Sequence, residues 1–521
     1  MASNDWPQTR AERTDFQETS RYTDVVAFLR QLQKRGAPLS LRWMGSSPKG
    51  RRIPLAIASR PLVLSPAEAR NSGRPVVYIQ ANIHGGEVEG KEAALHLLRA
   101  FSQEGRGGIL DQLILLIAPI YNIDGNENWG PQETHRPGQN GPAIVGTRAN
   151  GAGLDLNRDC MKLESPEMRG VLAHVYSWDP HAIIDLHTTN GTRQGYELSY
   201  APMLNPSTET CMLGFTRDEL LPAVRKGLRG RYRMETFDYG NVANRGGRPA
   251  WRTFSPDPRF VTNYGGLRNR ITVLSEAISY FPFKERVIAT ERFVKAVLDF
   301  IAENAQRVIT VTARADAQIA RWGKDPQEAP RLGVRFALDR KGEANVYIQP
   351  PRRKGARKSK GNPAKFVWVK MPVFDRFKAT RTTRFPSGYI IPADMKNVVA
   401  LLQRHGIIVQ KGSRDQEIQV QEFLIRKAYR QKKAFQRHRL VRLEGRFVET
   451  TRKAKAGDFL VPTAQPLGLL AFHLLEPESL DGVAAWGLLH HRLKPRSAFP
   501  VVKYFGRSAV RPGQVGGQGS N

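Results

Sequence analysis

Short apolar segments alternate with amphipathic helical patterns through the first 305 residues, and this alternation constrains the fold more than any other feature of the sequence. The apolar runs are 76–81, 113–117, 182–186 and 271–274. The helical patterns are 23–36, 90–101, a segment that begins at Ser165, and roughly 284–305. Continuously apolar strands between helices are typical of parallel sheets that are covered on both faces. The sequence therefore predicts an α/β fold with a mostly parallel mixed sheet flanked by helices.

The pattern changes after about residue 306, where strand-like segments such as 366–369 and 418–425 dominate and one clear helical pattern covers 394–405. These features predict a second, smaller unit of α+β or β-rich structure. We expect four parts in all. They are a polar N-terminal segment (1–20), the α/β domain (21–305), a basic accessory domain (306–510) and a disordered tail (511–521).

The chain is strongly basic, with 80 Lys and Arg against 48 Asp and Glu and a net charge of +32. Much of this excess lies in residues 351–460, which hold 28 Lys and Arg against 8 Asp and Glu. Basic and aromatic residues alternate there, as they do in proteins that bind single-stranded nucleic acids. The alternative is a set of strands with one apolar and one basic, solvated face. We keep contact with a polyanion through residues 351–460 as an added property, not as the main function.

Composition and hydropathy exclude several classes of protein. Hydrophobic residues make up 40% of the chain, which is enough for a full core, so the chain is not disordered as a whole. The longest apolar stretch, around 113–118, is far shorter than the roughly 18 residues that span a bilayer, so no transmembrane segment is predicted. Two cysteines form neither a disulfide framework nor a cysteine zinc site. The polar first twenty residues show no secretory signal, which favours a cytoplasmic protein, although a trimmed N-terminus would fit a periplasmic or secreted one.

The segment YIQANIHGGEVEG contains an H-x-x-E pair, His84 and Glu87, just after the predicted strand at 76–81. An imidazole nitrogen and a carboxylate on neighbouring backbone are two ligands for a borderline metal ion such as zinc. We expect Gly85 and Gly86 to permit a tight turn that brings both side chains to one point. The segment therefore predicts part of a metal site.

A catalytic zinc site needs a third protein ligand and an open position for water. His187 follows the apolar run in AIIDLHTTNG, one hundred residues after Glu87. In open α/β sheets, ligands gather at the carboxyl ends of the strands, where His84, Glu87 and His187 would meet. Ligating histidines usually donate their second N–H to a carboxylate or a carbonyl, and Asp155 and Asp185 are the candidates here. His187 is therefore the candidate third ligand.

Two further segments carry charged groups that suit hydrolysis. The loop GTRANGAGLDLNRD contains Arg148, Asn157 and Arg158, which are two cations and an amide that can bind a carboxylate and polarise a carbonyl oxygen. Glu276 follows the apolar strand in ITVLSEAISYF, where a carboxylate can take a proton from metal-activated water and deliver it to a leaving amine. Taken alone, the first segment would be interpreted as a solvated basic loop and the second as an exposed strand end. The proposed roles of these residues therefore depend on the predicted metal ligands as well.

Together, these motifs resemble the zinc carboxypeptidase (carboxypeptidase A-like metallopeptidase) family. The shared elements, over roughly residues 70–280, are HGGE, P-x-YN-x-DG, R-x-N-x-x-G-x-DLNRD, DLHTT and a strand-borne glutamate. The resemblance implies a zinc metallopeptidase that hydrolyses a peptide bond next to a free C-terminal carboxylate. It also implies that the hydrolysis uses a metal-activated water with a glutamate as general base. The segments GYIIPAD, HGIIV and FLVPTAQPLG suggest a bacterial two-domain member.

The resemblance implies a role for each candidate residue. The implied ligands of one Zn²⁺ ion are His84, Glu87 and His187, with Asp155 steadying His84. The implied carboxylate-binding residues are Asn157 and Arg158. The implied catalytic residues are Arg148, which polarises the scissile carbonyl, and Glu276, which is general base and then general acid.

Three points stay open at this stage. The family often places a tyrosine before the catalytic glutamate, and both Tyr239 and Tyr264 precede Glu276. The DLHTT motif also resembles the succinylglutamate desuccinylase/aspartoacylase branch, which removes acyl groups from amino acids, so the substrate is either a peptide or an acylated amino acid. A catalytically inactive protein that binds through its basic C-terminal domain is the third alternative.

Overall fold

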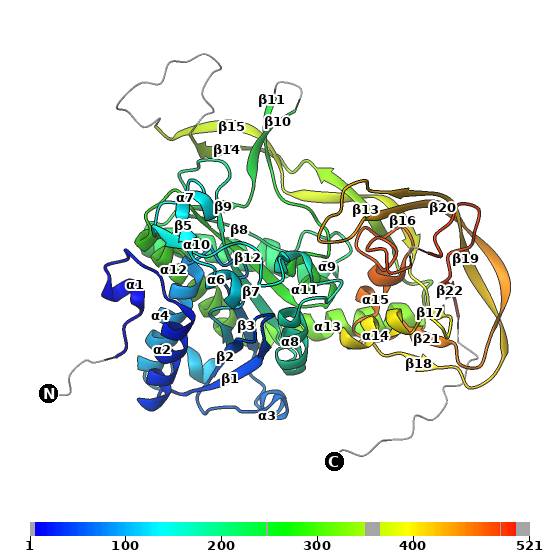
Figure 1. Cartoon of the computed structure of the whole chain (residues 1–521), viewed down its shortest axis with the longest axis horizontal. Coiled ribbons are helices and arrows are strands. Elements are labelled where there is room, and N and C mark those ends of the chain that lie inside the picture. The colour runs from blue at the N-terminus through cyan, green and yellow to red at the C-terminus, as the bar shows by residue number, and fades with distance from the viewer. Residues whose placement is uncertain (1–5, 246–247, 350–364, 490, 507–521) are drawn as a thin grey trace.

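The computed structural model describes residues 6–245, 248–349, 365–489 and 491–506, and an eight-stranded mixed sheet forms its centre (Figure 1). In spatial order the strands are β1 (Leu39–Ser46), β2 (Arg52–Ala58), β4 (Ile114–Ala118), β3 (Val76–Ala81), β7 (Ala182–Thr189), β12 (Ile271–Ile278), β8 (Leu198–Ala201) and β9 (Thr236–Asp238). The four central strands β4, β3, β7 and β12 are parallel. The pairs β1–β2, β2–β4 and β8–β12 are antiparallel, and the edge strand β9 is parallel to β8. The predicted α/β class, with a mixed sheet that is mostly parallel at its centre, is confirmed.

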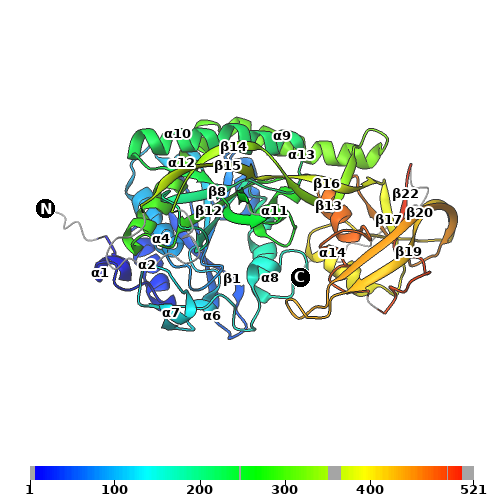
Figure 2. The same ribbon diagram turned by 90° about the horizontal axis from the view of Figure 1, so that it is seen from above.

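Helices cover both faces of this sheet (Figure 2). The long ones are α2 (Tyr22–Lys34), α4 (Glu89–Gln103), α8 (Pro166–His174), α10 (Leu221–Tyr232), α11 (Val261–Leu267) and α12 (Phe283–Glu303). The α8 helix begins where the sequence predicts, because the Ser165 hydroxyl accepts a hydrogen bond from Met168 N at 3.1 Å and Pro166 needs no donor partner in the first turn. Short elements complete this part of the chain: α1 (Arg10–Arg13), α3 (Pro66–Asn71), α5 (Ile109–Gln112), α6 (Ile123–Asn126), β5 (Gly130–Pro131), α7 (Gln132–His135), β6 (Ile144–Val145), η1 (Leu156–Arg158), η2 (Tyr176–Trp178), α9 (Thr210–Gly214) and η3 (Phe215–Leu220).

The rest of the chain is rich in β-structure, as predicted. A six-stranded sheet contains β18 (Gln410–Lys411), β21 (Phe459–Pro462), β17 (Gly388–Ile391), β22 (Val502–Tyr504), β19 (Gln416–Arg430) and β20 (Val441–Ala454). A pair joins β13 (Arg331–Asp339) to β16 (Arg376–Arg384), and the helices are α13 (Ala305–Lys324), α14 (Lys396–Arg404) and α15 (Gly468–Leu475). The helix α13 was not predicted, although its buried residues Val308, Thr312, Ala315 and Ile319 follow a helical spacing.

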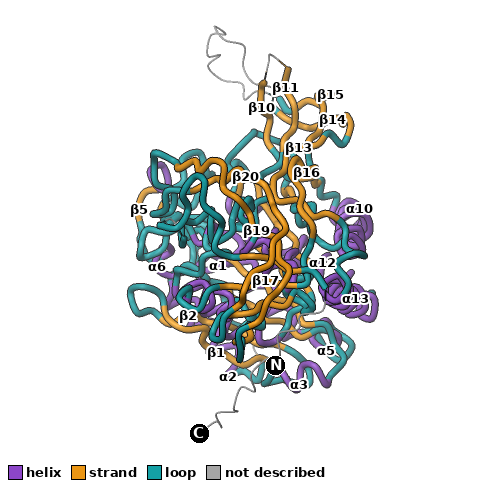
Figure 3. The backbone as a smooth tube through the Cα atoms, turned by 90° about the vertical axis from the view of Figure 1, so that its right-hand side faces the viewer, coloured by secondary structure: helices purple, strands orange, loops and turns teal. Residues whose placement is uncertain are grey.

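A third sheet combines strands from both sides of the predicted domain boundary at residue 305. It contains β10 (Asn241–Arg245), β11 (Arg248–Arg252), β15 (Val367–Phe374) and β14 (Gly342–Ile348), with β11 parallel to β15. Figure 3 shows β10, β11, β14 and β15 together at the top of the view. One hydrophobic core also joins the central sheet to the later region and contains both Ile184 and Phe385. The domain limits given above stay a prediction.

Some predictions concern residues that the structure does not describe, and one concerns membrane-spanning segments. Residues 351–364, which begin the basic region 351–460, and the predicted tail 511–521 lie outside the described residues. Within the described ranges, no helix combines the length and the hydropathy needed to cross a bilayer.

Candidate active site

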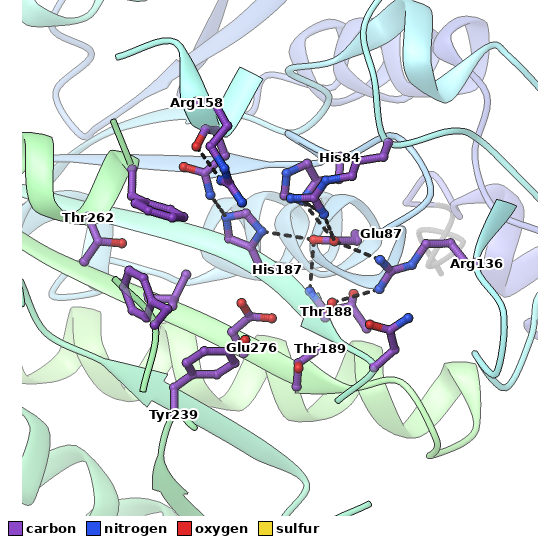
Figure 4. Close-up of a pocket in the computed structure, with 16 residues that line it drawn as sticks. His84, Glu87, Arg136, Arg158, His187, Thr188, Thr189, Tyr239, Thr262 and Glu276 are labelled. Carbon is purple, nitrogen blue, oxygen red and sulfur yellow. Dashed lines mark hydrogen bonds and ion pairs between the residues drawn. The ribbon is translucent and has the colours of Figure 1, made fainter. Parts of the chain in front are cut away.

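The candidate residues come together at the carboxyl ends of three parallel strands. His84 lies three residues beyond β3, while His187 in β7 is the register partner of Glu276 in β12. Because paired residues in neighbouring parallel strands point to the same face, His187 and Glu276 face one space (Figure 4). All three side chains are buried.

The turn that carries His84 and Glu87 depends on the small size of its glycines. A Cβ on Gly85 would lie 2.2 Å from the carbonyl carbon of Gly125, and one on Gly86 would lie 2.7 Å from Arg136 Cγ. The expected tight turn is present, since Glu87 N donates to the carbonyl oxygen of His84 at 2.9 Å. Both glycines have φ outside the left-handed region, so they permit this turn through the close approach of neighbouring atoms.

Three candidate metal ligands converge on one point. The Nδ1 atom of His84 lies 2.9 Å from Glu87 Oε1, and the Nδ1 atom of His187 lies 3.0 Å from Glu87 Oε2. The opposite nitrogens face carboxylates, with His84 Nε2 3.1 Å from Asp155 Oδ1 and His187 Nε2 2.8 Å from Asp185 Oδ2. Each of the two candidate aspartates therefore supports a different histidine.

This donor set fits a zinc ion. One ligand atom from each of His84, Glu87 and His187 lies within 4.8 Å of the others. When the Nε2 atoms donate to carboxylates, the lone pairs are on Nδ1 and point at the Glu87 oxygens. Lone pairs facing a carboxylate repel each other unless a proton or a cation lies between them. Two imidazoles and one carboxylate are the ligands of catalytic zinc sites that keep an open position.

The electrostatics of the metal-free protein agree with this interpretation. Burial opposes a charge on His187, but the carboxylates of Asp185 and Glu87 outweigh it and raise the pKa of His187 well above 6.5. Burial also opposes charge on Glu87, yet His84 and Arg136 hold the pKa of Glu87 well below 4.5. A proton on His187 thus occupies the place that a cation would take.

Zinc binding to the metal-free protein at pH 7 is therefore expected to release about one proton from His187, because a ligating imidazole must be deprotonated. Zinc affinity should fall as the pH falls, since protons then compete for the same nitrogen. Calorimetric titration in two buffers of different ionisation enthalpy measures the release. Asp185→Asn, which removes the carboxylate that raises the pKa of His187, should reduce the release, and buffer-independent heats in the parent protein would contradict this account.

The residues predicted to contact the substrate line one cavity of about 230 Å³. Its wall contains every predicted ligand and catalytic residue: His84, Glu87, Arg148, Asn157, Arg158, His187 and Glu276. Asp155 is not in this wall, because it lies behind His84 and accepts a hydrogen bond from Arg148 Nε at 2.9 Å.

The two carboxylate-binding candidates are held by a neighbouring loop. Asn157 Oδ1 accepts a hydrogen bond from Val261 N at 3.0 Å, and the Arg158 guanidinium carbon lies 4.2 Å from the centre of the Phe260 ring. Arg158 Nη1 also donates to the carbonyl oxygen of Asn157 at 2.6 Å. These contacts fix a cation and an amide at one end of the cavity.

Glu276 and one tyrosine lie at the other side of the cavity (Figure 4). Burial, with a smaller contribution from the Glu87 charge, raises the pKa of Glu276 to about 8, although His187 opposes this shift. Tyr239 lines the same cavity. Tyr264 is buried elsewhere, with its hydroxyl 2.8 Å from His405 Nδ1. Of the two tyrosines left open by the sequence, only Tyr239 can reach a molecule in the cavity.

Arg136, which contacts a predicted metal ligand, was not among the residues predicted from sequence. Its Nη1 lies 3.1 Å from Glu87 Oε1, and its Nη2 donates to the carbonyl oxygen of Thr188 at 2.8 Å. Arg136 lies in none of the motifs considered above, and its position depends on how the chain between α6 and β6 folds back over the HGGE turn. A buried cation here stabilises the charged form of Glu87.

Comparison with known proteins agrees with the site. Residues 25–202 match the family model described as zinc carboxypeptidase. Carboxypeptidase 2 of Trichophyton tonsurans is 22% identical over 494 residues, covering 90% of this chain and 84% of the relative. Carboxypeptidase 2 of Trichophyton rubrum is 21% identical over 490 residues, with the same coverage.

Solved structures of the same class also match. A metallo-carboxypeptidase from Burkholderia cenocepacia aligns with a TM-score of 0.41 and 16% identity, covering 55% of this chain and 69% of that one. Carboxypeptidase A from Helicoverpa armigera aligns with a TM-score of 0.37 and 17% identity, covering 57% and 74%. Residues 25–202 therefore match the zinc carboxypeptidase family, and this similarity, with that to the curated carboxypeptidases, indicates a metallocarboxypeptidase hydrolase.

Proposed function

We propose that the protein hydrolyses the peptide bond next to a free C-terminal carboxylate, with one zinc ion held by His84, Glu87 and His187. The observation that carries this proposal is the shared cavity. The converging ligand atoms, the Arg158 guanidinium and the Glu276 carboxyl group all face the same space.

Different residues of the cavity wall suit different parts of the substrate. Arg158 and Asn157 bind the terminal carboxylate, because a guanidinium and an amide offer several fixed donors to its oxygens. Arg148 donates to the oxygen of the scissile carbonyl as negative charge develops there. When bound, zinc supplies Lewis-acid chemistry at that carbonyl and activates water at neutral pH.

Glu276 carries the proton in this scheme. Its carboxylate takes a proton from the attacking water and passes it to the leaving amine nitrogen, so the same group is base and then acid. In the metal-free protein its pKa is about 8, and a cation bound nearby lowers that value. A group that titrates near neutral pH is suited to both steps.

The experiment that tests this function is mass spectrometry of a mixed substrate set after incubation with the zinc-loaded protein. The set contains peptides with free C-termini, the same peptides with amidated C-termini, and N-acyl amino acids. Loss of single residues from free C-termini alone is the expected result. Cleavage confined to acyl amino acids would instead assign a deacylase, and zinc binding without any turnover would favour a binding protein.

Arg158→Ala should lower kcat/KM for peptides with a free C-terminus by about 10- to 100-fold, because a charge-assisted hydrogen bond to the substrate is lost. Residual cleavage of amidated peptides should hardly change, since they offer no carboxylate. Steady-state kinetics on matched free and amidated peptides measure the difference. Arg106→Ala, an exposed arginine remote from the cavity, is the control. Equal losses on both substrates would contradict the carboxylate-binding role.

A further inference from the structure

A turn from the C-terminal region reaches the loop that carries the predicted substrate-binding residues. The long strands β19 and β20 are joined by residues 431–440, and we call residues 435–438 the hairpin tip. The backbones of Phe435 and His438 exchange hydrogen bonds of 2.8 and 2.9 Å. Gln436 and Arg437 between them both have left-handed φ values, 48° and 68°.

These two residues adopt a conformation that usually selects other residue types. Two consecutive positive φ values in a two-residue hairpin define a type I′ turn, where Asn-Gly is preferred. Long side chains at such positions are disfavoured by backbone sterics. Residues held in such a disfavoured conformation often have a functional role, and here the contacts of their side chains indicate one.

The side chain of Gln436 contacts the backbone of the site. Gln436 Oε1 accepts a hydrogen bond from Asp155 N at 2.9 Å, across 281 residues of sequence. Further contacts from the hairpin tip join the Arg437 guanidinium to the carbonyl oxygen of Ala152, and His438 Nε2 to Glu164 Oε1 at 2.6 Å. The hairpin tip thus holds residues 150–159, which we call the carboxylate-binding loop because it carries Asn157 and Arg158.

A second link joins the C-terminal region to the loop that supports these two residues. The fully buried Asp481 accepts hydrogen bonds from Arg259 N and Nε at 2.8 and 3.1 Å, and its other oxygen lies 2.7 Å from Arg259 Nη2. The Arg259 guanidinium carbon is also 4.9 Å from the Trp486 ring. The next two residues, Phe260 and Val261, are those that support Arg158 and Asn157.

We propose that the hairpin tip completes the substrate site by holding the carboxylate-binding loop, and that Gln436 is a positioning residue that acts through Asp155. This inference rests on the proposed function and assigns a role to the C-terminal region. Gln436 does not line the cavity, so its effect is on the placement of Arg158 and Asn157 and not on chemistry.

The test compares variants that keep or remove the acceptor oxygen. Gln436→Gly removes it and also relieves the left-handed backbone, so the fold is not weakened by strain. Gln436→Glu keeps an acceptor oxygen at the same reach, and Lys433→Ala, exposed on the same hairpin, is the control. Each variant is prepared as the full chain with equal zinc content. KM and kcat are measured on a peptide with a free C-terminus, and hydrogen–deuterium exchange is measured over residues 150–159.

For Gln436→Gly we expect KM to rise about tenfold with kcat within about twofold, because substrate and transition state lose the same contact. Exchange at residues 150–159 should accelerate, whereas Gln436→Glu and Lys433→Ala should resemble the parent protein in both measurements. Unchanged KM or unchanged exchange in Gln436→Gly would overturn the positioning role while the proposed function stands. Absence of hydrolysis by the parent protein would overturn the proposed function itself and the role assigned to Gln436 with it.

Discussion

Replacing Glu276 with glutamine should reduce kcat by about 10²- to 10⁴-fold while zinc stays bound. General acid–base groups contribute rate factors of this size. The amide keeps the shape of the side chain, but it cannot take the proton from water or give one to the leaving nitrogen. Zinc should remain, because Glu276 is not among the three converging ligands. The measurements are kcat on a peptide with a free C-terminus and zinc content by plasma mass spectrometry.

One control variant and one contradicting outcome make this result specific. Glu303→Gln changes an exposed glutamate at the end of α12 and should keep the parent rate. A Glu276→Gln protein that retained most of its rate would show that the proton passes through another group, and Tyr239, which lines the same cavity, is a candidate.

The His84→Ala variant should lose both zinc and turnover. Removal of a residue that only supports a ligand usually costs 10- to 100-fold in metal affinity, so removal of a ligand should cost more than about 100-fold. The affinity is measured by competition with a chromophoric chelator, and turnover is followed on the same samples. The matched variant is Asp155→Asn, which leaves the three ligands in place but weakens the support of His84. Its zinc affinity and its turnover should lie between those of His84→Ala and those of the parent protein.

His84 is buried, so its replacement could also disturb the fold. Circular dichroism and thermal unfolding of the metal-free proteins separate the two effects, because the parent protein without zinc is then the reference. Zinc retained by a folded His84→Ala protein at parent affinity would contradict the ligand assignment.

The centre of the fold could be predicted from sequence because its strands are buried on both faces and therefore continuously apolar. The strands β3, β4, β7 and β12 all coincide with predicted apolar runs. The helix α13 could not be found by the same argument, since its apolar residues are spaced among arginines and alanines in a region that otherwise has strand patterns.

Some residues of the candidate site could likewise be predicted from the strands, whereas others could not. His84, Glu87, His187 and Glu276 lie at strand ends, and strand order places them together without detailed knowledge of the loops. Arg136 contributes through a long loop whose path depends on the whole fold. Such contacts join residues that are far apart in sequence, and no local pattern marks them.

Long-range contacts explain why the role of the C-terminal region was also not predicted. Basic and aromatic residues in 351–460 suggested a surface for polyanions, whereas the contact described here comes from the single turn between β19 and β20. The amide of Gln436 has no charge or periodicity that would distinguish it from other glutamines of the chain. Its role depends on the fold, which brings it to Asp155, a residue 281 positions earlier in the sequence.

The pairing of β11 with β15 affects when the enzyme becomes complete during synthesis. Thr253 N, directly after β11, donates to Phe374 O at the end of β15, and Phe254 beside it lines the cavity. About 115 residues separate the two strands, which a ribosome adds in roughly 6 to 23 s at 5–20 residues per second. During that interval the nascent chain holds the zinc ligands without the finished wall of the cavity. The wall of the cavity is therefore finished only after nearly three quarters of the chain has been synthesised.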